Sequence, residues 1–135
     1  MAIDFLQEKI RKMKNPTMVG LDPYLPILPP HIVQDAFAQQ GQTLAAAASA
    51  YYRFCTELLD RLKELVPAVK IQSACFEALG AEGIAQMQRI AACAKELGYY
   101  VLIDSMRGDV GNIAEIHAQA MFGRVPVGLT EQEVY

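Results

Sequence analysis

The sequence has few of the side chains that usually build metal or redox sites: three cysteines and two histidines among 135 residues. Cys55, Cys75 and Cys93 are widely spaced, odd in number and contain no C-x-x-C pair. This spacing argues against a disulfide framework and favours a reducing compartment. His31 and His117 have no partners at ligand spacing, so we predict no metal site.

The chain also lacks a strong charge bias and any long apolar run. Its net charge is −3, with 53% hydrophobic and 20% charged residues, which is typical of a single globular domain. An acidic balance argues against a nucleic-acid partner. The small-residue run at residues 44–50 is too short to cross a membrane, and polar residues interrupt the N-terminus early. We therefore predict a soluble, cytoplasmic protein.

Two further kinds of site have no support in the sequence. Gly108 and Gly111 are not followed by the residues of a P-loop or of a dinucleotide-binding fingerprint. Ser73 and Ser105 have no histidine placed to activate them. The pattern thus favours neither a glycine-rich phosphate loop nor nucleophilic catalysis.

Strand-like and helix-like patterns alternate three times along the chain. Short apolar runs that predict strands occupy residues 17–22, 68–72 and 99–104. Helical patterns follow them at residues 31–65, with a break at Gly41, at residues 80–98, with Gly98 as the C-cap, and at residues 112–122. Four prolines mark residues 23–30 as a loop.

Apolar residues recur at intervals of three and four in two of these helices, which predicts one buried face for each. The first face comprises Leu44, Ala48, Tyr51, Cys55, Leu58, Leu62 and Leu65. The second comprises Ile84, Met87, Ala91, Ala94 and Leu97.

Repeated strand–helix units predict an α/β fold with a parallel sheet and right-handed crossovers. Two architectures fit: a small open sheet, or about three βα repeats of a TIM (β/α)8 barrel. A complete barrel needs roughly 250 residues, so this chain would supply under half of one.

Polar residues gather where the predicted strands end, at the edge where barrel enzymes place their chemistry. The third strand runs into Asp-x-x-Arg-Gly-Asp at residues 104–109, and Gly-Leu-Asp-Pro stands at residues 20–23. Val-Lys-Ile-Gln at residues 69–72 puts a lysine inside an apolar strand. An unpaired buried ammonium is costly, so Lys70 should reach a polar site or a carboxylate.

Together these motifs resemble the orotidine 5′-phosphate decarboxylase family, and Phe-Glu-Ala-Leu-Gly at residues 76–80 is similar to its bacterial-type subgroup. The resemblance implies part of a TIM barrel that decarboxylates orotidine 5′-phosphate to uridine monophosphate in pyrimidine biosynthesis, without metal or organic cofactor. It implies a nucleotide ligand and a dimer.

The resemblance also implies residue roles. Asp22 and Lys70 match ribose-contacting residues, and Lys70 is expected beside Asp104. Lys70, Asp104 and Asp109 are the expected catalytic residues, with Asp109 reaching across a dimer interface. Met106 stands where the family has the lysine that protonates the ring carbanion. Methionine has neither charge nor proton, so we expect very weak or no decarboxylation.

We expect residues 1–123 to be the barrel-like part and residues 124–135 to be an irregular tail. Phosphate-binding loops after strands seven and eight, which the family uses, have no counterpart in this sequence. The favoured hypothesis is a truncated, impaired decarboxylase. The alternatives are a non-enzymatic barrel-derived module that binds nucleotides or other proteins, and an independent small α/β domain. Open sheet edges predict a homo-oligomer.

Overall fold

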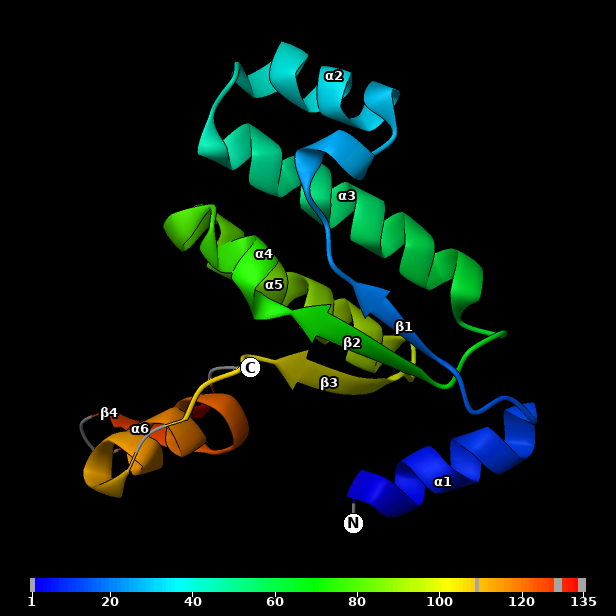
Figure 1. Cartoon of the computed structure of the whole chain (residues 1–135), viewed down its shortest axis with the longest axis vertical. Helices are drawn as coiled ribbons and strands as arrows, with labels where there is room; N and C mark the ends of the chain where they lie inside the picture. Colours follow the sequence, from blue (N-terminus) through cyan, green and yellow to red (C-terminus); the bar gives the residue numbers. More distant parts are fainter. Residues whose placement is uncertain (1, 109, 128–129, 134–135) are drawn as a thin grey trace. The chain divides into compact units, whose positions relative to one another are not determined.

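A computed structural model describes residues 2–108, 110–127 and 130–133, which divide into two units, residues 1–104 and 105–135. The first unit is built from the following elements in chain order: α1 (Ala2–Met13), β1 (Met18–Leu21), a 3-10 turn (Leu25–Ile27), α2 (Pro30–Gln40), α3 (Leu44–Leu62), β2 (Ala68–Gln72), α4 (Ser73–Glu77), α5 (Gly80–Glu96) and β3 (Tyr100–Asp104) (Figure 1).

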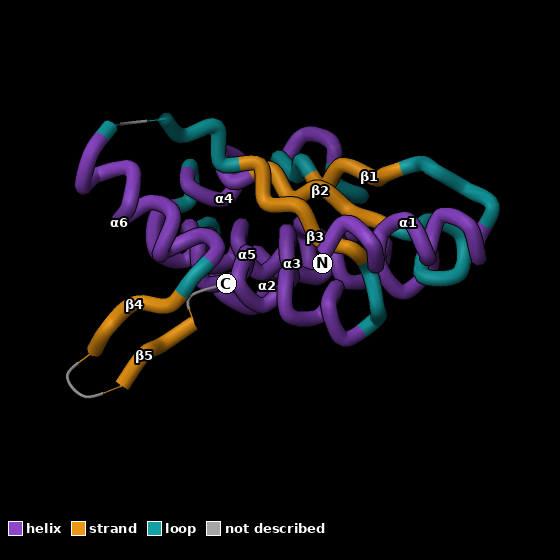
Figure 2. Tube along the Cα trace, turned by 90° about the horizontal axis from the view of Figure 1, so that it is seen from below, coloured by secondary structure: helices purple, strands orange, loops and turns teal. Residues whose placement is uncertain are grey.

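The three strands of this unit form a parallel sheet in the order β1-β2-β3. Figure 2 shows α3 and α5 together on one side of this sheet. Val69 and Ile71 of β2 point into that side and are at most 1% exposed. Met18 and Leu102, in contrast, remain 38% and 39% exposed. The sheet therefore has one covered face and one open face, and the α/β architecture predicted from the sequence is confirmed.

Local signals set the helix boundaries. Gly41, with a φ of 69°, separates α2 from α3 at the predicted break. Thr43 then caps α3, because its hydroxyl oxygen accepts a hydrogen bond of 3.1 Å from the Ala46 amide. Leu97, rather than the predicted Gly98, is the C-cap of α5, and Gly98 follows it with a φ of 80°.

The core lies between α3, α5 and the sheet. The ring of Phe76 meets Tyr51 edge to face, with 6.0 Å between the ring centroids. The Tyr99 hydroxyl donates a 2.6 Å hydrogen bond to the Leu59 carbonyl, so this buried phenol is satisfied. Burial raises the pKa of Tyr99 to about 12, and nearby acidic groups add to the effect.

The residues in the middle of each predicted helix face are buried, as expected, whereas some residues at the ends of the first face are exposed. Ala48, Tyr51 and Cys55 are buried, as are Met87, Ala91 and Ala94. Leu44 and Leu65 are 57% and 59% exposed, since Leu44 is the first residue of α3 and Leu65 lies beyond its end. Leu59, rather than Leu58, is the buried leucine of that helical turn.

The second unit contains α6 (Gly111–Phe122) and an antiparallel pair of strands, β4 (Arg124–Val127) and β5 (Thr130–Glu133). The sequence predicts an irregular tail here, whereas these residues pair as a hairpin. Short strands with a proline and several polar residues give little periodicity, and cross-strand pairing supplies the order. A domain boundary after residue 123 stays a prediction.

None of the helices in the described parts of the chain combines the length and apolarity needed to cross a bilayer.

Candidate functional site

The polar residues singled out from the sequence lie along the carboxyl-terminal edge of the parallel sheet. Asp22 directly follows β1, Lys70 and Gln72 belong to β2, and Asp104 is the last residue of β3. The register pairs Gly20 with Lys70 and Gln72 with Asp104. Because side chains alternate along a strand, Lys70 and Gln72 lie on the face opposite Val69 and Ile71. The open face of the sheet thus carries the polar groups.

Lys70 reaches a carboxylate, as its place in an apolar strand predicts. Its Nζ donates a 2.6 Å hydrogen bond to Asp22 Oδ1. The two side chains are 25% and 45% exposed, respectively. A pair this open to solvent contributes about 1 kcal/mol or less to stability. Its chief effect is to fix the ammonium at the edge of the sheet.

Gly20 makes room for this pair. A Cβ at position 20 would lie 2.5 Å from Asp22 Oδ2 and 3.5 Å from Lys70 Cε. Any larger residue would therefore displace the Asp22 carboxylate. The motif Gly-Leu-Asp-Pro contains this glycine, but the clearance it provides can be recognised only once the strand register is known.

Asp104 has a different partner from the one expected. The family resemblance implies that Lys70 lies beside Asp104; the hydrogen bond that the structure gives Asp104 comes from Gln72, whose Nε2 donates to Asp104 Oδ2 at 3.2 Å. Sequence reasoning missed Gln72 as a site residue. The available signal was its position two residues after Lys70, which puts both side chains on one face.

Met106 does not share a strand face with Asp104. Residues two apart share a face only while a strand continues, and β3 ends at Asp104. Met106 has a φ of 47° and is 87% exposed, so the alternation of the strand does not extend to it. Asp109 lies outside the described residues.

The cysteines near this edge are not thiolates at neutral pH. Burial is the main cause that raises the pKa of Cys75; the Asp22 carboxylate raises it further, and Lys70 opposes the shift. Burial raises the pKa of Cys55 to about 12. Cys55 is fully buried and packs as a small apolar residue, as predicted, whereas Cys75 and Cys93 are only partly buried. A protonated thiol is a poor nucleophile.

The edge therefore offers one ammonium, two carboxylates and one amide. These groups can bind hydroxyls and place a negative charge near a ligand. Within the described residues there is no cluster of three or more histidine, cysteine, aspartate or glutamate side chains that could hold a metal ion.

The amino-acid sequence of this chain is similar to those of known enzymes. An orotidine 5′-phosphate decarboxylase of Rhodopirellula baltica is 36% identical over 118 residues, which are 87% of this chain and 38% of that protein. The enzyme of the same name from Roseiflexus sp. is 32% identical over 83% of this chain and 36% of that protein. No protein-family model matches the chain.

Solved structures agree with the sequence comparison. A Toxoplasma gondii protein described as an orotidine-monophosphate decarboxylase superposes with a TM-score of 0.71 and 27% identity, over 88% of this chain and 36% of that one. The parallel βα units are thus part of a TIM barrel. The chain is therefore related to the orotidine 5′-phosphate decarboxylases and spans between 36% and 38% of the length of the relatives named above.

Proposed function

We propose that this chain supplies the first three strands of an orotidine 5′-phosphate decarboxylase site, in a form with impaired catalysis. The observation that carries the proposal is the Asp22–Lys70 pair, 2.6 Å apart, at the same sheet edge as Asp104. Asp22 and Lys70 offer a carboxylate and an ammonium to the hydroxyls of a ribose. The substrate is a pyrimidine nucleotide.

The proposed chemistry requires a charge and a proton. Loss of carbon dioxide from the pyrimidine ring leaves the bonding electron pair on the ring carbon, and a proton must then be delivered there. Asp104 provides negative charge near the carboxylate that leaves as carbon dioxide. The hydrogen bond to Asp22 keeps the Lys70 ammonium at the same edge of the sheet. Met106 has no proton to deliver, so the protonation step lacks its general acid. Asp109 is proposed to complete the site from a second subunit.

A second candidate function is a non-enzymatic nucleotide-binding module. Met106 favours it, because the proposed proton donor is replaced while the ribose-binding groups Asp22 and Lys70 are retained. The two proposals differ in how tightly this chain alone binds a nucleotide.

Calorimetric titration with uridine monophosphate and its 6-substituted analogues tests both. We expect weak binding, with a dissociation constant of about 1 mM, because the chain has no phosphate-binding loop. Lys70→Met and Asp22→Asn should each remove the detectable heat. Arg61→Met, which removes a charge from an exposed end of α3, should leave it unchanged. Equal loss of binding heat in all three variants would contradict the assignment of Lys70 and Asp22 to the ribose. A micromolar dissociation constant for the unchanged chain would favour the non-enzymatic binding module.

We further propose that the protein is cytoplasmic and self-associates. In the described part of the chain β1 and β3 each pair only with β2, so both leave one edge free. Met18 and Leu102 are exposed apolar residues on these strands. α1 has no buried residue at all. Unpaired edges beside exposed apolar side chains favour association between copies.

Sedimentation at micromolar concentration should therefore show dimers or larger species. Leu102→Lys should shift the distribution toward monomer, since it places a charge on the open face of β3. Leu65→Lys, at a position 59% exposed after α3, is the matched control and should have no effect. A monodisperse monomer with a cooperative melt would contradict this expectation.

A further inference from the structure

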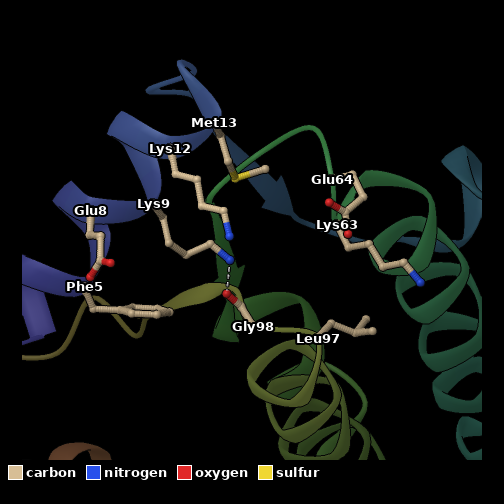
Figure 3. Close-up of a pocket in the computed structure, with 9 residues that line it drawn as sticks. All are labelled: Phe5, Glu8, Lys9, Lys12, Met13, Lys63, Glu64, Leu97 and Gly98. Carbon is tan, nitrogen blue, oxygen red and sulfur yellow. Dashed lines mark hydrogen bonds between the residues drawn. The ribbon is translucent and has the colours of Figure 1, made fainter.

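We propose that the pocket between α1, the end of α3 and the turn before β3 binds a small organic molecule with one carboxylate on a flat apolar body (Figure 3). The pocket has a volume of about 370 Å³. Its residues precede β2 and β3, so it lies at the amino-terminal ends of these strands. The Asp22–Lys70 pair lies at the opposite, carboxyl-terminal edge. The pocket is thus separate from the proposed decarboxylase site.

The apolar part of the pocket is formed by Phe5, Met13 and Leu97. Phe5 is 44% exposed, and α1 buries none of its residues. A flat apolar ligand would therefore cover surface that the protein leaves open to water. Cavities of a few hundred cubic ångströms with apolar walls and a few polar groups are typical of small-molecule sites.

Two ammonium groups supply the polar part. Lys9 and Lys12 are three residues apart on α1, a spacing that makes their side chains neighbours, and both extend into the same space in Figure 3. Lys9 Nζ donates a hydrogen bond to the Gly98 carbonyl and lies 5.7 Å from the centroid of the Phe5 ring. These contacts hold the Lys9 side chain in the pocket lining.

Lys12 has no hydrogen bond or ion pair recorded among the described residues, and it is exposed. Two neighbouring ammonium groups repel one another. An anion between the ammonium groups of Lys9 and Lys12 reduces this repulsion and accepts hydrogen bonds from both. The carboxylate of the ligand is therefore placed between Lys9 and Lys12, with its apolar body against Phe5 and Leu97.

The remaining charges limit the ligand to a single negative charge. Glu8 and Glu64 also line the pocket, and their carboxylates oppose a further anionic charge. Lys63, the third lysine of the lining, already pairs with Asp60 at 2.8 Å. A monocarboxylate is therefore favoured over a phosphate monoester, which carries close to two charges at neutral pH.

Titration of the full chain with benzoate, phenyl phosphate and benzyl alcohol at low salt tests the proposal, with amide chemical shifts as the readout. Benzoate should saturate in the millimolar range and shift the amides of α1 and of residues 97–98. Phenyl phosphate and benzyl alcohol should each bind more weakly. Added salt should weaken benzoate binding, since the lysines are partly exposed.

The matched variants are Lys12→Ala and Arg11→Ala, which remove one charge each from the same turn of α1. Only Lys12 lines the pocket, so Lys12→Ala should weaken benzoate about three- to fivefold and Arg11→Ala should not. Equal weakening by both, or benzyl alcohol binding as well as benzoate, would overturn the proposal. Absence of saturation up to about 20 mM would do the same. Circular dichroism of each variant checks that α1 remains folded.

Discussion

Met106→Lys is expected to raise the rate of orotidine 5′-phosphate decarboxylation by about 10²- to 10⁴-fold, but only when the chain is continued into the rest of a barrel. The gain is that of a positioned general acid, which methionine cannot replace. In the 135-residue chain alone, the same substitution should give no measurable turnover, because contacts to the substrate phosphate supply the binding energy that the reaction uses.

The experiment compares the chain with a fusion in which the Rhodopirellula baltica enzyme continues the sequence from about Gly123. Met106→Gln is the neutral control and should stay as slow as the parent fusion. Met106→Arg separates charge from proton: arginine keeps the positive charge but does not release its proton, so it should recover only part of the rate. Turnover by Met106→Lys in the unfused chain would show that phosphate anchoring is dispensable. No gain in the fusion would contradict the role assigned to position 106.

The largest expected loss of stability comes from Gly83→Ala. Gly83 lies in α5 where this helix packs against the end of α4. A Cβ at this position would overlap the carbonyl oxygen of Phe76 and lie 2.9 Å from Leu79 Cβ. Backbone atoms cannot rotate out of the way as a side chain can, so α4 or α5 must shift. Phe76 itself is fully buried, and its packing would be disturbed with it.

Overpacking of this kind typically costs about 1–3 kcal/mol, against about 1 kcal/mol that alanine contributes over glycine inside a helix. Because the overlap is with backbone atoms, we expect the cost at the upper end of this range, about 3 kcal/mol. The net loss is then about 2 kcal/mol, which lowers the melting temperature by about 8 °C. Gly108→Ala is the control, since a Cβ there meets no atom within 4 Å. Thermal unfolding followed by circular dichroism measures both variants. An unchanged melting temperature for Gly83→Ala would contradict the close contact between Gly83 and the Phe76 carbonyl.

The strands of the first unit and the boundaries of α2, α3 and α5 were predicted well from the sequence because their signals are local, whereas no boundaries were predicted for α1 and α4. The strand at residues 68–72 follows Pro67, and the break between α2 and α3 falls at Gly41. Glycine tolerates the positive φ found there, and its presence in a helical pattern is visible without any tertiary information.

The partners within the candidate site could not be predicted in the same way. Lys70 was expected to need a carboxylate, but whether Asp22 or Asp104 provides it depends on the register of three strands and on the clearance at Gly20. Gln72 acquires its role only from its place opposite Asp104. Likewise, the left-handed φ of Met106 follows from how the chain leaves β3, which no residue pattern signals.

The strand order β1-β2-β3 has a consequence for how the chain folds. Each strand pairs with the next one along the sequence, and one helix of each connection, α3 or α5, lies on the same side of the sheet. Every long-range contact of this sheet is therefore available as soon as the following strand has left the ribosome. Each pairing closes a long loop, because Met18 pairs with Ala68 and Ala68 pairs with Tyr100, and parallel sheets of this kind form slowly. Growth from the amino terminus during synthesis nevertheless lets each strand pair before the next one has been made. The barrel fold can thus be assembled one strand at a time, with the edge of the latest strand as the template for the next.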